Sequence, residues 1–538
     1  MKKNKKGVSL IILLITIIVL LIISGVVINN LKGHLEIHKI EQLASRADIR
    51  AYREELENYV MTELSRNEDL DKEDVYESNP ENLSKYIPSI KEEHKKIFII
   101  SKGELLRRPF VNPPKLVGCM IPIKFNGNNW QICSETDSDW YDYVTPNRKW
   151  ANVMLSDGTY KDKTKIGQVV EDKDLGSMFV WIPRFSYSVV KYKTRTNKYE
   201  GELDGFPIFN VTFLLKNTNI DEKNKKYPKS YNIEECVLGQ KTPKIVHPGF
   251  NYAGKERTGF WISKFEAGNR KDRFESFTPN IEIKLYPEIE YKIDFSKNML
   301  GQENIYGLNS KEVYSHIARP CEFGAVTYLA GSQYGIVPTE NYVGNEKFLT
   351  GGGDYRKNIT QSTTENVTGI YDLNGGRPEY TAAYYDVQNN MINNEIKNRI
   401  NENPQNFDVY KVAEEEKNDN TDSRYTSGNI EEIKKLAKQR FELNSDKFGD
   451  GIYELTMDGS YYINNGNEQG KFEKAEIIPN LCNNDSLYLG LNREPYICYG
   501  GKNSDRQSSK MGIYSCHNAT EKEADNCSFR IILIPKEK

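Results

Sequence analysis

Residues 259–266, with the sequence GFWISKFE, carry the clearest indication of the fold. Aromatic and β-branched side chains favour a pleated strand, and here they alternate with small or charged ones. This alternation predicts a central strand in which one set of side chains is buried and the other is exposed.

Other short runs of apolar and aromatic residues lie on both sides of this stretch, and turns rich in Gly, Asn and Asp separate them. The further predicted strands are residues 97–101, 117–123, 131–133, 178–182 and 187–192, and the predicted helices are 322–332, 391–401 and 430–443. No clear linker follows residue 115, so we expect one large α+β domain over residues 115–538. Residues 389–427 are rich in Asn, Glu and Lys and are interpreted as an exposed insertion.

Seven segments occur in a characteristic order within this domain. They are FVWIPRF (179–185), HPGF (247–250), GFWISKFE (259–266), EFGAV (322–326), QSTT (361–364), GIYDLNGG (369–376) and SFR (528–530). In this order they resemble bacterial proteins with a formylglycine-generating-enzyme-like (sulfatase-modifying-factor) domain. The resemblance covers about residues 117–535 and implies a decorated C-type-lectin-like fold.

The enzymes of that family oxidise a substrate cysteine with two closely spaced cysteines near an Arg-Gly-Gly stretch. The matching residues here are 497–501, where Tyr499 replaces the arginine, and the next cysteine after Cys498 is Cys516. We therefore expect no catalytic residues, and a domain that serves adhesion or ligand binding. The alternative is an active oxidoreductase of the formylglycine-generating type, or another enzyme on the same fold.

The family's calcium-ligating turn corresponds to residues 375–380. Glu379 is retained, but the asparagine ligand and the tryptophan are absent. One carboxylate together with backbone carbonyls could still hold Ca²⁺ through Glu379, and a solvated turn is the alternative. We predict no other cofactor.

Eight cysteines are present, without a C-x-x-C motif, which argues against a zinc ribbon or a thioredoxin-type site. Four lie near the C-terminus, at Cys482, Cys498, Cys516 and Cys527. Outside the cell they could form disulfides, and buried thiols are the alternative. Two polar loops, residues 483–486 and 500–509, are candidates for ligand binding, with ordinary surface loops as the alternative.

The N-terminus indicates where the chain resides. Lysines precede Gly7, and an almost unbroken apolar run extends over residues 8–28. Such a run can cross a hydrocarbon core of ~30 Å as one helix. Because lysines stay on the cytoplasmic side, we expect a single-pass protein of the cell membrane with everything after residue 30 outside, on a bacterial surface.

Residues 5–10, Lys-Lys-Gly-Val-Ser-Leu, resemble a prepilin signal, which is cut between Gly7 and Val8. The resemblance implies a leader over residues 1–7 and a pilin-like helix over 8–66 whose first half spans the membrane. Apolar residues do recur at near-helical spacing as far as Leu64, and residues 67–114 would connect the helix to the domain. Ile12 stands where the family usually has glutamate, so filament assembly stays open, and a plain signal anchor is the alternative.

Charge and composition limit the partners. The 73 basic and 76 acidic residues nearly balance, so nothing indicates a nucleic-acid surface. The expected partners are the lipid bilayer, other pilin-like subunits, and an unknown extracellular glycan or protein ligand.

Overall fold

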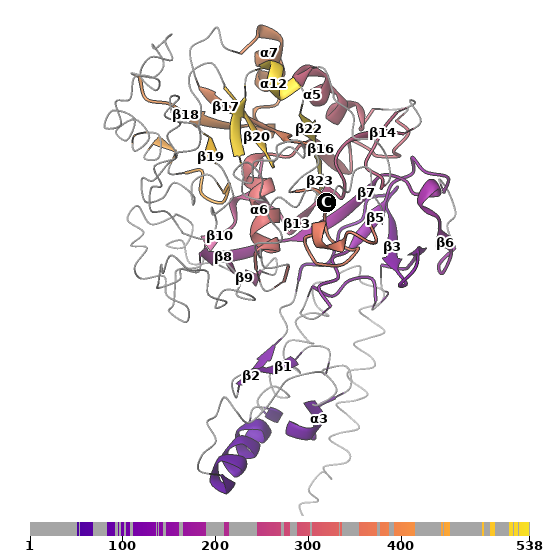
Figure 1. Ribbon diagram of the computed structural model, residues 1–538, viewed down its shortest axis with the longest axis vertical. Coiled ribbons are helices and arrows are strands. Elements are labelled where there is room, and N and C mark those ends of the chain that lie inside the picture. The colour runs from indigo at the N-terminus through magenta and orange to yellow at the C-terminus, as the bar shows by residue number, and fades with distance from the viewer. Residues whose placement is uncertain are drawn as a thin grey trace, which may run out of the picture. The chain divides into compact units, whose positions relative to one another are not determined.

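The computed structural model describes residues 51–67, 83–91 and 98–107 and most of 111–536 (Figure 1). Its longer gaps in the last range are 190–208, 215–244, 336–354, 415–438, 452–486 and 501–515, and shorter gaps occur elsewhere. The chain divides into two compact units, Met1–Pro109 and Phe110–Lys538. The apolar segment 8–28 and the junction of Gly7 and Val8 lie outside the described residues.

The first unit has a small core of its own. A helix over residues 54–66 ends where the sequence predicts. Its buried face belongs to one apolar cluster with the short helix α3 (Leu83–Tyr86) and the residues that follow α3. The cluster consists of Tyr52, Leu56, Val60, Leu83, Tyr86, Ile87 and Ile90. Strands β1 (Phe98–Ser101) and β2 (Glu104–Arg107) form an antiparallel hairpin, so the strand predicted at 97–101 is confirmed.

The second unit contains an eight-stranded sheet in which all neighbours are antiparallel. Its order is β16 (Val313–Ile317), β23 (Ile531–Pro535), β13 (Gly259–Ser263), β7 (Met178–Pro183), β5 (Asn152–Met154), β3 (Ile121–Phe125), β4 (Trp130–Ile132) and β6 (Val169–Val170). The last strand in the chain, β23, therefore lies between β16 and β13, which precede it by more than 200 residues.

A second sheet has mixed strand directions and is built by the C-terminal part of the chain. Its order is β18 (Asp408–Lys411), β17 (Glu379–Asp386), β20 (Tyr496–Tyr499), β21 (Cys516–Ala519) and β19 (Leu487–Tyr488), and β22 (Ser528–Phe529) also pairs with β17. A three-stranded sheet joins β10 (Ile245–Val246), β8 (Phe185–Val189) and β9 (Phe209–Phe213). Two hairpins complete the strands: β11 (Asn251–Tyr252) with β12 (Lys255–Glu256), and β14 (Gly268–Arg270) with β15 (Phe274–Ser276).

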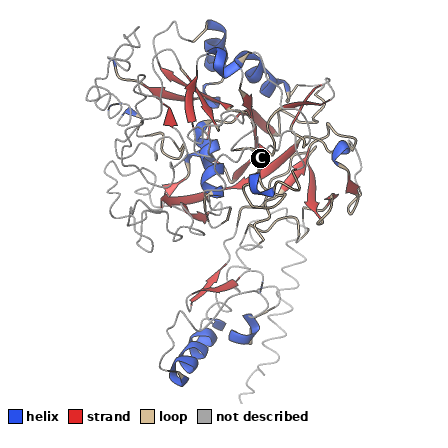
Figure 2. Ribbon diagram, in the orientation of Figure 1, coloured by secondary structure: helices blue, strands red, loops and turns tan. Residues whose placement is uncertain are grey.

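The helices of the second unit are few. They are α5 (Ile289–Asn298), α6 (Pro320–Ala330), α7 (Asn394–Glu402) and α12 (Glu521–Asp525), with short 3-10 helices η1 (Asp172–Asp174), η4 (Pro248–Phe250), η6 (Ile359–Gln361) and η7 (Pro404–Asn406). Every residue of α6 is buried. Figure 2 shows this helix inside the unit, and it contacts both β9 and β17.

The secondary structure agrees with several predictions. Residues 178–182 and 131–133 coincide with β7 and β4, and residues 322–332 and 391–401 coincide with α6 and α7 to within a few positions. The strand predicted at 187–192 begins earlier, at Phe185. Most of the helix predicted at 430–443 lies outside the described residues.

The central strand is buried on both faces, and the predicted alternation of buried and exposed residues is therefore wrong. Phe260, Trp261 and Ile262 are each at most 1% exposed, although successive side chains of a strand point to opposite faces. The charged residues that follow, Lys264 and Glu266, are buried as well. The sequence pattern gave a wrong prediction because Lys264 and Glu266 have hydrogen-bond partners inside the protein.

The insertion predicted near 389–427 is not an exposed one where the structure describes it. Residues 392–414 contain α7 and β18 and bury Ile396, Ile400, Phe407 and Tyr410 in the main core. Ile396 and Ile400 lie four residues apart, on one face of α7. The Asn, Glu and Lys residues around them obscured this amphipathic spacing.

Candidate functional site

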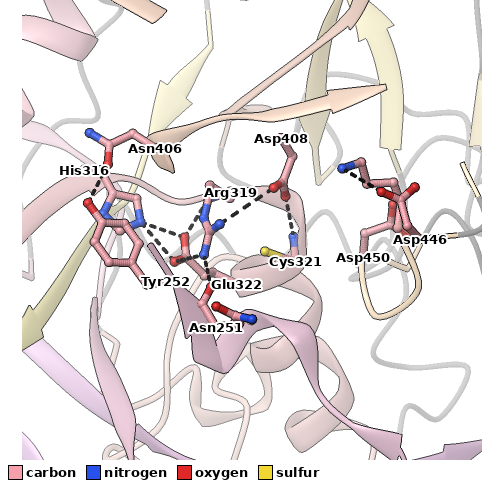
Figure 3. A network of polar contacts seen from close by, with 12 residues as sticks. Asn251, Tyr252, His316, Arg319, Cys321, Glu322, Asn406, Asp408, Asp446 and Asp450 are labelled. Atoms are coloured by element: carbon pink, nitrogen blue, oxygen red, sulfur yellow. Dashed lines mark hydrogen bonds and ion pairs between the residues drawn. The ribbon is translucent and has the colours of Figure 1, made fainter. Parts of the chain in front are cut away.

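A buried polar network surrounds the N-terminus of α6 (Figure 3). Pro320 occupies the first turn of the helix, where its missing N–H is not needed. Glu322 reaches back so that its Oε2 accepts the backbone N–H of Arg319 at 2.9 Å. Its Oε1 accepts from Nη2 of Arg319 at 2.9 Å, and Nε2 of His316 lies 2.9 and 3.0 Å from the two oxygens.

The same network reaches three other segments. The ring of Tyr252 in β11 stacks on His316 at 4.9 Å between centroids, and its hydroxyl donates to Oδ1 of Asn406 at 2.6 Å. Nη1 of Arg319 lies 3.8 Å from Asp408, the first residue of β18. The network therefore links β16 of the large sheet to α6, to the β11–β12 hairpin and to the second sheet.

The electrostatics of this network support a structural role. Burial alone would raise the pKa of the Glu322 carboxyl, but the charges of Arg319 and His316 and the hydrogen bonds from both residues outweigh it and lower the pKa to about 2. Burial raises the pKa of the neighbouring Cys321 thiol well above its usual range, which disfavours the thiolate that a nucleophilic cysteine requires. Sequence analysis missed this network, although Arg-Pro-Cys-Glu at residues 319–322 contains a helix-start signal in its Pro and Glu.

A second buried cluster surrounds Arg530. Nε and Nη2 of its guanidinium lie 2.8 and 2.7 Å from Oε1 of Glu379, at the start of β17. Its remaining N–H groups donate to the backbone carbonyls of Ser263, Lys264 and Tyr371. Arg530 therefore joins the end of the central strand to the second sheet.

Two further carboxylates belong to this cluster. Burial, followed by the negative charges of Glu379 and Asp372, raises the pKa of Glu266 well above its usual range. Burial also raises the pKa of Glu379, although the charge of Arg530 opposes the shift. The positive charge of Arg530 faces both carboxyl groups and only partly offsets the effect of their burial.

The burial of Glu379 excludes one of the two interpretations of its turn, and the calcium site stays a prediction. Glu379 is 1% exposed, so the solvated turn is wrong. One of its oxygens is held by Arg530, and Oε2 has no hydrogen-bond partner within the described part of the chain. Residues 374–376 of the turn lie outside the described residues. Among the residues that are described, no group of three or more His, Cys, Asp or Glu side chains could hold a metal ion.

Lys264 occupies a pocket of aromatic rings and carbonyls beside this cluster. Its Nζ donates to the backbone oxygens of Val367 and Gly369, both at 2.6 Å, and lies 5.2 Å from the ring centre of Trp130 and 5.4 Å from that of Tyr371. Burial lowers the pKa of this amine well below its usual range. The lysine of the GFWISKFE stretch is therefore a buried hydrogen-bond donor that holds residues 367–369 against β13.

The position that carries an arginine in the enzyme family is also a core position here. Tyr499 packs its ring against Phe323 and donates its hydroxyl to the backbone oxygen of Asp450 at 2.6 Å. Burial raises the pKa of this phenol well above its usual range. Tyr499 therefore bridges β20 and α6 and has no access to solvent.

The structure separates the two cysteines that the enzymatic alternative would need. Cys498 pairs with His517 across β20 and β21, whereas Cys516 pairs with Tyr499. Adjacent positions of a strand face opposite sides of the sheet, so Cys498 and Cys516 lie on different faces. Cys498 instead lies beside Cys527, a contact that the spacing in the sequence did not indicate.

Comparison of this chain with protein-family models and with curated proteins gives no match. Two loops, 483–486 and 500–509, are candidates for ligand binding, and all of their residues except Gly500 lie outside the described residues.

Proposed function

We propose that this protein is a membrane-anchored, pilin-like surface protein whose second unit binds an extracellular ligand. The observation that carries the proposal is the N-terminal sequence, in which a lysine cluster precedes the apolar run 8–28. A cluster of this kind retains its end of a membrane helix in the cytoplasm, so the rest of the chain would face outward. No helix within the described residues is long and apolar enough to cross a membrane, and the run 8–28 is not among them.

The buried polar groups support binding over catalysis. The ionisable clusters around Glu322 and Arg530 hold elements of the second unit together, and their charged atoms are turned toward one another. Binding a ligand requires only an exposed surface on a stable domain, and these clusters stabilise the second unit. The expected ligand is a glycan or a protein at a cell or matrix surface, and the expected fold remains C-type-lectin-like.

Processing provides the first test of this proposal. In a bacterium that possesses a prepilin peptidase, the mature chain should begin at Val8, as shown by intact-mass analysis of the membrane-extracted protein. Gly7→Val should leave the chain starting at Met1, because the side chain blocks the junction, whereas the matched control Gly25→Val should still be cut. Protease treatment of intact, wall-stripped cells should release peptides of the second unit.

Two results would contradict the proposal in different ways. If the wild-type chain is not cut but protease still releases its second unit, the pilin-like signal is excluded and the plain signal anchor is supported. Protection of all peptides until lysis would refute the orientation itself.

Binding is tested on the same cells. Cells that display the full chain should adhere to an array of immobilised glycans and matrix proteins, and cells that display a chain ending at Pro109 should not. The shorter chain retains the membrane segment and the first unit, so it controls for expression and anchoring. Equal adhesion by the two cell types would rule out the second unit as the binding part.

A further inference from the structure

Two cysteines far apart in the sequence meet in the core of the second unit. The Sγ atoms of Cys498 and Cys527 are 3.0 Å apart, which is closer than the van der Waals contact of two sulfurs. Cys498 is 0% exposed and Cys527 is 3% exposed. A disulfide bond of ~2.05 Å requires the two atoms to approach by only about 1 Å more.

The backbone holds both residues at the same end of β17. Cys498, in β20, is the antiparallel partner of Tyr380. Cys527 immediately precedes Ser528, which is the parallel partner of Glu379, the neighbour of Tyr380. The backbone N–H of Cys527 also donates to the carbonyl of Ala524 in α12 at 3.1 Å. Three elements therefore hold the backbone of the two residues close to each other.

The geometry also decides against a bond between Cys498 and Cys516. Cys516 is the partner of Tyr499 in the β20–β21 ladder and so lies on the opposite face from Cys498. Cys482 lies outside the described residues. We propose that Cys498 and Cys527 form a disulfide bond that closes the segment between them.

The bond would form by thiol–disulfide exchange. The thiolate of one cysteine attacks the disulfide of an oxidoreductase or of oxidised glutathione and forms a mixed disulfide. The second thiolate then attacks the protein sulfur of that mixed disulfide, and the donor leaves as its second thiolate. The two protein thiols lose two protons and two electrons in total, and the donor disulfide becomes two thiols. Because both sulfurs are buried in the folded unit, exchange takes place before β20 and α12 pack together.

The bond would constrain the part of the chain that carries one candidate binding loop. Residues 498–527 include β21, α12 and residues 501–515, and the bond would tie both ends of this segment beside β17. Closing a loop of this length removes conformations from the unfolded chain and so stabilises the folded one. The inference depends on the proposed function only for the oxidising compartment in which the bond would form.

The test maps the thiols of the full-length protein. Protein is extracted from membranes and unfolded in denaturant in the presence of an alkylating reagent, so that buried thiols are labelled, then digested without reduction and analysed by mass spectrometry. We expect a cross-linked peptide pair that contains Cys498 and Cys527, lighter than the two thiol peptides by two hydrogens, and an alkylated Cys516. Wild type and Cys516→Ala should lose on the order of 5 °C in Tm upon reduction, whereas Cys498→Ala and Cys527→Ala should not respond.

A second arm separates this inference from the assignment of the compartment. The purified full chain is refolded in detergent with a mixture of reduced and oxidised glutathione. If the pair forms there but not in cells, the pairing stands and the outward location is refuted. If Cys498 and Cys527 remain alkylatable after oxidative refolding, if Cys516 is cross-linked to either of them, or if the pair holds zinc, the proposal is overturned.

Discussion

Replacing Arg530 with methionine should destabilise the second unit by about 3–5 kcal/mol, because it leaves buried carboxylates without their cation. Arg530 is itself 1% exposed, and its guanidinium contacts Glu379 and three backbone carbonyls from two other segments. Methionine fills part of the volume but donates no hydrogen bond. Chemical denaturation of the purified protein, followed by tryptophan fluorescence, measures the loss.

The pH dependence of this variant has a definite sign. Burial already raises the pKa values of Glu266 and Glu379, and removal of the positive charge should raise them further. A carboxyl whose folded pKa lies above its unfolded pKa stabilises the fold below the unfolded value, and that stability is lost as pH rises through the folded value. The difference between Arg530→Met and wild type should therefore be smaller near pH 5 than near pH 8.

Two further variants make this prediction specific. Glu379→Gln added to Arg530→Met should recover part of the lost stability, because it removes the charge that has lost its partner. The matched control is Arg399→Met, which breaks the partly exposed ion pair with Asp294 and should cost less than about 1 kcal/mol. An Arg530→Met protein as stable as the control would show that the buried cluster contributes little.

Replacing Glu322 with glutamine should be the second most damaging of these changes, at roughly 3 kcal/mol at neutral pH. The estimate follows from the lowered pKa of this carboxyl, since each pKa unit corresponds to about 1.4 kcal/mol. Glutamine keeps the shape and one acceptor oxygen but loses the charge that faces Arg319 and His316. The variant keeps the carboxyl group of Asp408 near Arg319, with its Oδ1 3.8 Å from Nη1 of the arginine.

The pKa of Glu322 is shifted in the opposite direction from those of Glu266 and Glu379, but the difference between variant and wild type is again smaller in acid. The folded pKa of Glu322, about 2, lies below the value of an unfolded glutamate, so its contribution is fully present above about pH 4.5 and is lost as pH falls toward 2. Wild type and Glu322→Gln should therefore differ most at neutral pH and converge in acid. Urea denaturation between pH 3 and 7 tests this, with Glu402→Gln in the exposed pair with Lys297 as the control. A constant difference across this range would mean that the carboxyl contributes through packing and not through its charge.

Much of the local structure could be predicted from the sequence because it depends on neighbouring residues. The runs at 131–133 and 178–182 become strands, and the apolar residues near 322–332 and 391–401 become helices. Helix and strand periods are local properties, so a window of about ten residues contains enough information to indicate them. The lysine cluster and the apolar run at the N-terminus predict a membrane anchor in the same way, from composition alone.

The roles of the polar residues could not be predicted in this way. Lys264 and Glu266 resemble the exposed half of an alternating strand, yet both are buried, because partners more than 100 residues away in the chain satisfy them. Glu379 resembles a turn residue or a metal ligand, yet it meets Arg530 from the last strands of the chain. Burial of a charge depends on what covers it, and that information lies outside any local pattern.

The sequence by itself determined the positions of many elements and the near balance of charge, and its residues 1–28 predict a membrane anchor. Only the tertiary structure decided which elements are neighbours. It places β23 between β16 and β13, and it brings Cys498 to Cys527 and away from Cys516. The physical reason is that pairing between distant strands is selected by the packing of the whole core, so one residue's neighbours depend on the register of all the others.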